Sequence, residues 1–173
     1  MRWRYVKNSS GTAGSDAAWV DGVQWLPART YSQWVSDHFT EQEMEDPAIV
    51  GQDADPDGDG TANLIEYAFD TDPHENDASL TRVTPEMVPV SGGKRLRLRF
   101  TLPEFIPTDL LYQIEVSDDL GGWTVVAEQS GAVGWSGAAG ATIAPAVNGR
   151  REHVITDTIH GNLRFGRVKV SVP

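Results

Sequence analysis

Four aspartates stand at alternate positions in the stretch DADPDGDG, residues 53–60, and an apolar run closed by Glu66 follows at once. Carboxylates this close repel one another and resist burial. A chain that gathers them in one short loop therefore needs a cation there. The loop predicts a bound metal ion, and the rest of the fold has to be built around it.

The twelve residues that begin at Asp55 fill every ligand position of a calcium loop. Positions 1, 3 and 5 are aspartates, position 6 is a glycine where the backbone turns sharply, position 7 offers its main-chain carbonyl, and position 12 is a glutamate able to supply both carboxylate oxygens. An acidic solvated loop is the alternative, and it leaves the glycine and the glutamate unexplained. Ca²⁺ suits the pattern better than Mg²⁺, because it takes about six to eight oxygen ligands. The predicted ligands are Asp55, Asp57, Asp59, Thr61, Asn63 and Glu66.

The negative charge of the chain is local. The 173 residues carry a net charge of −11, and residues 31–80 hold fourteen Asp or Glu with no Lys or Arg. Binding to nucleic acid or to an anionic membrane surface needs a basic face, so we expect neither partner. No apolar run of about 18 residues could span a bilayer, and the absence of cysteine excludes disulfides and thiolate metal sites.

Two short helices are predicted before the loop. The stretch TYSQWVSDHF has its large side chains at helical spacing, and Thr30 with Gln33 fits a capping box at its start. Thr40 and Glu43 repeat this signature. Pro47 prevents the second helix from continuing.

Strand patterns occupy both ends of the chain. The segments RWRYVK and AAWVDGVQWLP, with turn residues between them, predict a β-hairpin that is marginal alone and must pack on this chain or on a larger sheet. After Pro73, the alternation in KRLRLRFTL puts Leu96, Leu98 and Phe100 inward, and several further short strands follow. We expect Trp123 to lie in the core of the sheet rather than to form a sugar platform.

The predicted fold is mainly β with a short helical segment. It has three parts: an N-terminal β-hairpin at residues 1–27, a helical segment with an EF-hand-like calcium loop at residues 28–77, and a C-terminal antiparallel β-sandwich at residues 78–173. A helix that leaves the loop is expected to start near Asn63.

Three segments resemble known families. The stretch RYVKNSSGTAGSDAAWVDGVQW resembles the last two strands of lectin-like jelly rolls in large bacterial surface proteins. Residues 31–73 resemble a segment near the C-termini of large secreted or surface proteins of Verrucomicrobia-like and Planctomycetes-like bacteria, and the strands after residue 110 resemble the segment that follows it. The loop is also similar to single thrombospondin type 3 and dockerin-type calcium loops. The resemblance implies that the six predicted ligands carry the ion.

The loop differs from paired calcium loops in two features that bear on its function. The chain has a single loop, and Ala62 fills position 8, where paired loops carry a branched apolar residue; we therefore expect a static clamp rather than a regulatory switch or a cohesin-binding dockerin. Asp53, Asp70 and Asp72 are weaker candidates, since acids at such places bind neighbouring ions in thrombospondin-type arrays. We favour helix capping and solvation for these three.

The function expected is that of a noncatalytic calcium-binding structural module of a larger exported bacterial protein, at the cell surface or outside the cell, with its export leader upstream of Met1. The alternatives are a carbohydrate-binding or adhesive module, suggested by six tryptophans, and the noncatalytic tail of a secreted hydrolase. Partners other than calcium would be a glycan or another surface protein. The histidines have no metal-ligand spacing, and no nucleophile elbow or phosphate loop occurs, so we do not expect an enzyme.

Overall fold

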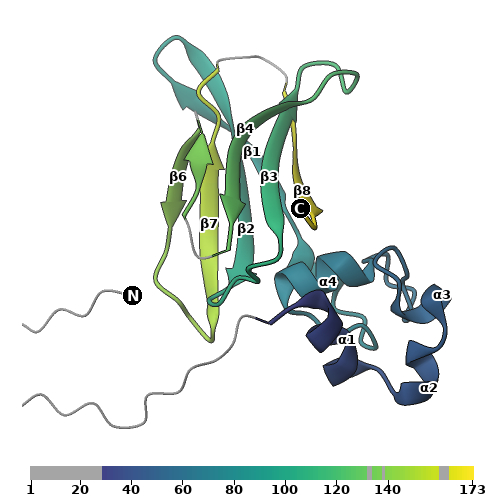
Figure 1. Ribbon diagram of the computed structural model, residues 1–173. Coiled ribbons are helices and arrows are strands. Elements are labelled where there is room, and N and C mark those ends of the chain that lie inside the picture. Colours follow the sequence, from purple (N-terminus) through teal and green to yellow (C-terminus); the bar gives the residue numbers. More distant parts are fainter. Residues whose placement is uncertain (1–28, 132–133, 138, 160–163) are drawn as a thin grey trace, which may run out of the picture.

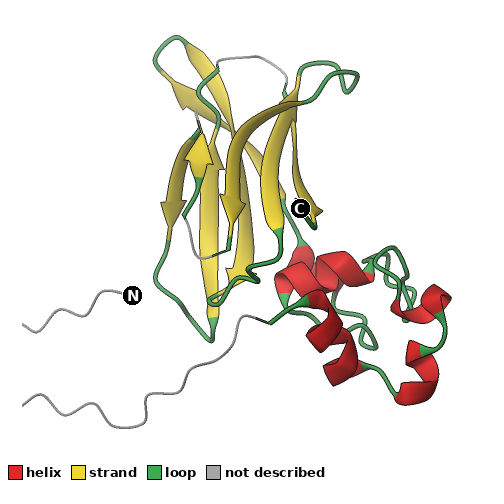
Figure 2. Cartoon of the chain, in the orientation of Figure 1, coloured by secondary structure: helices red, strands yellow, loops and turns green. Residues whose placement is uncertain are grey.

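The computed structural model describes residues 29–131, 134–137, 139–159 and 164–173. They form a β-sandwich with a group of short helices packed at one end (Figures 1 and 2). The predicted hairpin at residues 1–27 lies outside the described residues. The helices are α1 (Tyr31–His38), α2 (Glu41–Met44), α3 (Pro47–Val50), α4 (Asn63–Phe69) and the 3₁₀ turn η1 (Ala78–Thr81). The strands are β1 (Thr84–Val90), β2 (Gly93–Pro103), β3 (Leu111–Ser117), β4 (Thr124–Ser130), β5 (Ser136–Gly137), β6 (Gly140–Ile143), β7 (Arg150–Thr156) and β8 (Phe165–Ser171).

Two antiparallel sheets of four strands make the sandwich, with the orders β1-β2-β7-β6 and β5-β4-β3-β8. In β2 the side chains of Leu96, Leu98 and Phe100 are buried, as the alternation predicts. Tyr112 and Ile114 of β3 are buried in the same core. The fold is therefore mainly β with a short helical segment, as the sequence predicts.

Strands β1, β5 and β6 were not anticipated. β1 contains Pro85 and Pro89, and proline within a strand pattern normally argues against a strand. The structure places β1 at the edge of its sheet, beside β2 only. An edge strand tolerates proline because one of its sides has no neighbour to bond.

Both predicted capping boxes are present. In each box, the threonine side chain accepts a hydrogen bond from the backbone N–H three residues later, and the side chain of that later residue accepts one from the threonine N–H. The pairs are Thr30 with Gln33 and Thr40 with Glu43. Three helices, not two, precede the loop. Pro47 does end α2, but it also stands in the first turn of α3, where its missing N–H costs nothing.

An aromatic cluster joins the helices. Trp34 has no exposed surface, and the ring centroids of Tyr31, Phe39 and Tyr67 lie 5.5, 5.8 and 5.9 Å from its own. These side chains belong to one hydrophobic core with the buried residues of the sandwich. The helical segment and the sandwich therefore share one hydrophobic core.

Hydrogen bonds fix the end of α4 to the sandwich. The Tyr112 hydroxyl donates to the carbonyl oxygen of Ala68 at 2.7 Å, and Arg150 Nη1 donates to the carbonyl oxygen of Phe69 at 2.7 Å. The carbonyls at the end of a helix have no partner within it. Side chains of β3 and β7 supply those partners here.

Within the described ranges, no helix is both long and apolar enough to cross a membrane. This agrees with the hydropathy of the sequence.

Candidate metal centre

The predicted calcium loop connects α3 to α4. The carboxylates of Asp55, Asp57 and Asp59 offer oxygen atoms that all lie within 4.8 Å of one another. The structure therefore brings together the three aspartates that the sequence spacing selects.

Backbone N–H groups of the loop hold these aspartates in place. Gly58 and Gly60 donate to the two carboxylate oxygens of Asp55, both at 3.0 Å, and the N–H of Asp59 donates to Asp57 Oδ1 at 3.0 Å. Gly60 has a φ of +94°, which a residue with a Cβ rarely adopts. This is the sharp turn that position 6 of a calcium loop requires.

The surroundings of Glu66 point most strongly to a cation-binding site. Its side chain is 0 % exposed, and neither carboxylate oxygen has a hydrogen-bond partner. Its carboxylate lies within 4.8 Å of those of Asp59 and Asp77. Burial, and then the nearby carboxylates, raise the pKa of Glu66 to about 8. A buried, unpartnered carboxylate among other acids is costly unless a cation neutralises it, so this donor set fits a hard divalent cation such as Ca²⁺.

Asp59 belongs to two carboxylate groups, one with the other loop aspartates and one with Glu66 and Asp77. Its Oδ1 accepts from the Thr61 N–H at 2.7 Å, and its Oδ2 accepts from the Ala78 N–H at 2.7 Å. Burial alone would raise the pKa of Asp59, but the hydrogen bonds from Thr61, Ala78 and Asp77 together lower it. Asp59 is therefore held as an anion where the two groups meet.

Asn63, at position 9, makes contacts away from the aspartates. Its Nδ2 donates to the carbonyl oxygens of Ile49 at 2.8 Å and Gly51 at 3.0 Å, which ties the start of α4 to α3. Its Oδ1 is buried without a hydrogen-bond partner. A ligand role for Asn63, and for the main-chain carbonyl of the buried Thr61, stays a prediction from the spacing.

Asp77 was missed by the sequence analysis. It follows α4, outside the twelve-residue loop, and its N–H donates to Asp59 Oδ2 at 3.1 Å. Its own Oδ1 is buried and has no hydrogen-bond partner. The only available signal was the acidic run TDPHEND, in which no spacing distinguishes Asp77 from Asp72 or Glu75.

The three weaker candidates lie outside both carboxylate groups among the described residues. Asp70 ends α4 in the left-handed conformation, with a φ of +53°, and its carboxylate pairs with Arg29 at 3.2 Å. Asp72 Oδ1 accepts from the N–H of His74 at 3.0 Å, and Asp53 is exposed. These surroundings agree with capping and solvation.

Trp123 is not part of the buried core, so that expectation was wrong. It is half-buried just before β4, and the guanidinium carbon of Arg167 lies 4.1 Å from its ring centroid. A cation over the ring face occupies the surface that a sugar would use. Trp3, Trp19 and Trp25 lie outside the described residues.

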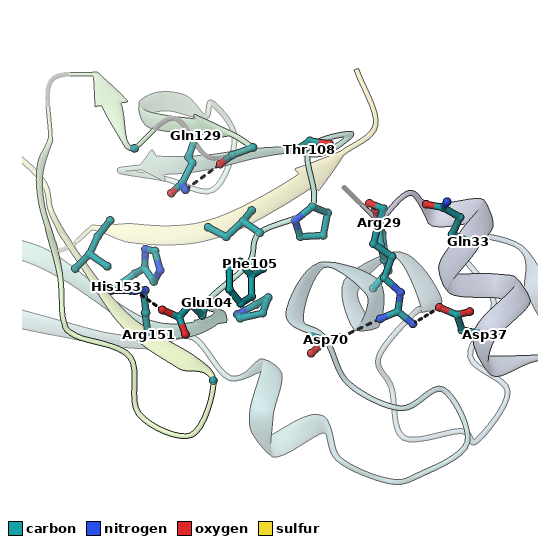
Figure 3. Close-up of a pocket in the computed structure, with 18 residues that line it drawn as sticks. Arg29, Gln33, Asp37, Asp70, Glu104, Phe105, Thr108, Gln129, Arg151 and His153 are labelled. Carbon is teal, nitrogen blue, oxygen red and sulfur yellow. Dashed lines mark hydrogen bonds and ion pairs between the residues drawn. The ribbon is translucent and has the colours of Figure 1, made fainter. Parts of the chain in front are cut away.

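A cavity of about 830 Å³ lies between the helical segment and the sandwich, with Phe105 on its wall (Figure 3). Charged side chains around it pair with one another. The pairs are Arg29 with Asp37, Arg29 with Asp70, and Arg151 with Glu104. Within the described ranges, the groups of three or more carboxylates that could hold an ion are those of the loop and Asp77, not those of this cavity.

Glu66, Asp55, Asp57 and Asp59 together make the strongest candidate site in the described part of the chain. Comparisons with protein-family models, with curated proteins and with solved structures found no match to this chain.

Proposed function

We propose that this chain is a noncatalytic calcium-binding structural module of a larger exported bacterial protein, in which the ion rigidifies the junction between β domains. The observation that carries the proposal is the burial of Glu66. Its side chain is fully buried next to the carboxylate of Asp59, and neither of its two carboxylate oxygens has a hydrogen-bond partner. Without a cation at this place, the chain would have to bury the charge of Glu66 or protonate the group, and both cost free energy.

The ion would be held by oxygen atoms alone. Asp55, Asp57 and Asp59 supply carboxylates from the loop, Thr61 supplies its main-chain carbonyl, and Glu66 supplies two oxygens from the first turn of α4. Bound Ca²⁺ neutralises the repulsion among these acids.

The contacts between α4 and the sandwich support a structural role for the ion. Glu66 lies on the same short helix as Ala68 and Phe69, whose carbonyls accept hydrogen bonds from the sandwich. An ion that fixes Glu66 therefore restrains the helix by which the loop is joined to the sheets.

Mass action supports an exported location. With a Kd of about 10 µM and free calcium of about 1 mM, as outside cells, binding stabilises the folded state by about 2.7 kcal/mol. This is a large part of a typical domain stability of about 5 to 15 kcal/mol. In a low-calcium compartment the carboxylates would repel one another without compensation.

Thermal unfolding with and without calcium tests the proposal. Protein freed of metal by a chelator should gain about 5 to 10 °C in Tm when 1 mM Ca²⁺ is restored. The same concentration of Mg²⁺ serves as the control and should give a smaller rise, because Mg²⁺ dehydrates reluctantly. An unchanged Tm in calcium would remove the structural role.

A further inference from the structure

Position 9 of the calcium loop is held by a neutral side chain, that of Asn63. Position 9 commonly reaches the ion, often through a water molecule. Here the amide nitrogen of Asn63 is engaged with the carbonyls of Ile49 and Gly51 in and after α3. The Oδ1 of Asn63 is buried without a hydrogen-bond partner, so this position offers the ion one neutral oxygen and no negative charge.

Asp77 offers an oxygen where one is needed. Its Oδ1 is buried and has no hydrogen-bond partner, and its carboxylate lies within 4.8 Å of those of Asp59 and Glu66. Glu66 independently points to a ligand, because it is 0 % exposed and both its oxygens lack a hydrogen-bond partner. Two carboxylates with unsatisfied buried oxygens lie beside the Asp59 carboxylate, and a cation between the three would compensate their burial.

The backbone also fixes Asp77 at this place. The N–H groups of Asp77 and Ala78 both donate to Asp59 Oδ2, at 3.1 and 2.7 Å. The segment after α4 is therefore held against the loop through one of its predicted ligands, and the Asp77 side chain does not have to be ordered by the ion itself.

We propose that Asp77 is a calcium ligand from outside the twelve-residue loop, which adds a carboxylate oxygen to the ligands that the loop supplies. The inference rests on the proposed calcium binding. Because Asp77 directly precedes η1, and β1 follows at Thr84, the ion ties the loop to the segment that enters the sandwich. Calcium then fastens the sheets from two sides, through α4 and through the start of η1.

A calorimetric calcium titration of the Asp77→Asn variant tests whether Asp77 is a ligand. The substitution keeps the size of the side chain and the backbone N–H, and we expect the Kd to rise about tenfold or more. Glu75→Gln is the matched control, since it removes one exposed negative charge from the same turn and should change the Kd less than threefold, as an exposed charge does. Equal Kd values for the two variants would overturn the inference while leaving the proposed function intact.

A hydration measurement separates a ligand from a residue that only positions Asp59. With Tb³⁺ in the site, luminescence lifetimes in H₂O and D₂O count the waters on the ion. This measurement uses Asp77→Ala, which has no side-chain oxygen: loss of the ligand should add about one water, whereas an unchanged count would contradict direct ligation. Asp77→Gly replaces the Ala variant if that protein does not fold. Absence of calcium uptake by the unmodified protein would instead overturn the proposed function, and the inference with it.

Discussion

The hydroxyl of Tyr112, the second residue of β3, donates a 2.7 Å hydrogen bond to the carbonyl oxygen of Ala68 in α4. Both residues are fully buried, and Ala68 follows Glu66 by two residues on the same helix. The helix that carries the proposed calcium ligand is therefore anchored in the core of the sandwich. Figure 1 shows α4 as the helix that lies against the end of the sheets.

Tyr112→Phe should destabilise the protein by about 1 to 2 kcal/mol, because it leaves the buried Ala68 carbonyl without a partner. Urea unfolding monitored by circular dichroism measures the change. Tyr31→Phe is the comparison, since the Tyr31 hydroxyl donates to the half-buried Val50 carbonyl, which water can reach more easily. A cost for Tyr112→Phe no larger than that for Tyr31→Phe would contradict the anchoring role.

Glu66→Gln should change stability in opposite directions with and without calcium. In chelator the variant should be more stable than the unmodified protein by about 1 to 3 kcal/mol, because a neutral amide relieves the buried charge and can donate to neighbouring carboxylates. In millimolar Ca²⁺ the order should reverse, because the variant lacks a carboxylate ligand. Urea midpoints in the two buffers measure this reversal.

Glu75→Gln is the control for that reversal, because Glu75 is exposed and carries the same charge. Its stability should stay close to that of the unmodified protein in both buffers. If Glu66→Gln behaved like Glu75→Gln, the buried carboxylate would have no special relation to an ion.

Gly60→Ala should cost about 1 to 2 kcal/mol and weaken calcium binding, because a Cβ strains the φ of +94° even though no atom lies within 4 Å of its position. Gly122→Ala is the matched control. A Cβ there also meets nothing within 4 Å, but the residue has no left-handed φ. Chemical unfolding of both variants should separate backbone strain from the simple loss of a glycine. Equal losses of unfolding free energy in the two variants would contradict strain at Gly60.

His153 should make stability depend on pH between about 6.5 and 4. Its side chain is 1 % exposed and its Nδ1 accepts from Trp135 Nε1 at 2.9 Å. Burial, and then the charge of Arg151, lower the pKa of His153 to about 4. The unfolded chain, with an ordinary pKa near 6.5, then binds more protons than the folded one in this window. Stability is thus complete above pH 6.5 and falls as the pH drops toward 4.

His153→Asn removes this titration and leaves an acceptor near Trp135. The difference in unfolding free energy between the two proteins should shift by about 3 kcal/mol between pH 7 and pH 4. Both are measured in chelator, so that the acidic loop contributes equally to each. A difference that does not change with pH would show that His153 is not buried in its neutral form.

Much of the fold was readable from local patterns. The capping boxes at Thr30 and Thr40 depend on residues three positions apart, and the burial of Leu96 and Leu98 follows from strict alternation. The carboxylates of the three loop aspartates lie close together because residues at alternate positions of one tight loop are brought to the same place by the turn. Such features are decided by neighbours in the sequence.

The features that were missed depend on distant parts of the chain. Asp77 meets Asp59 only because α4 and the turn after it fold back over the loop. Pro85 and Pro89 are acceptable only because β1 takes an edge position. Trp123 is covered by Arg167, a residue of β8 on another strand of its sheet. No local pattern encodes these partners.

Isothermal calorimetry of Ca²⁺ added to fully demetallated protein tests the central claim most directly. We expect saturable uptake of about one ion per chain with a Kd below about 1 mM, and loss of that uptake in Glu66→Gln. Absence of uptake at millimolar calcium, in protein that circular dichroism shows to be folded, would contradict it.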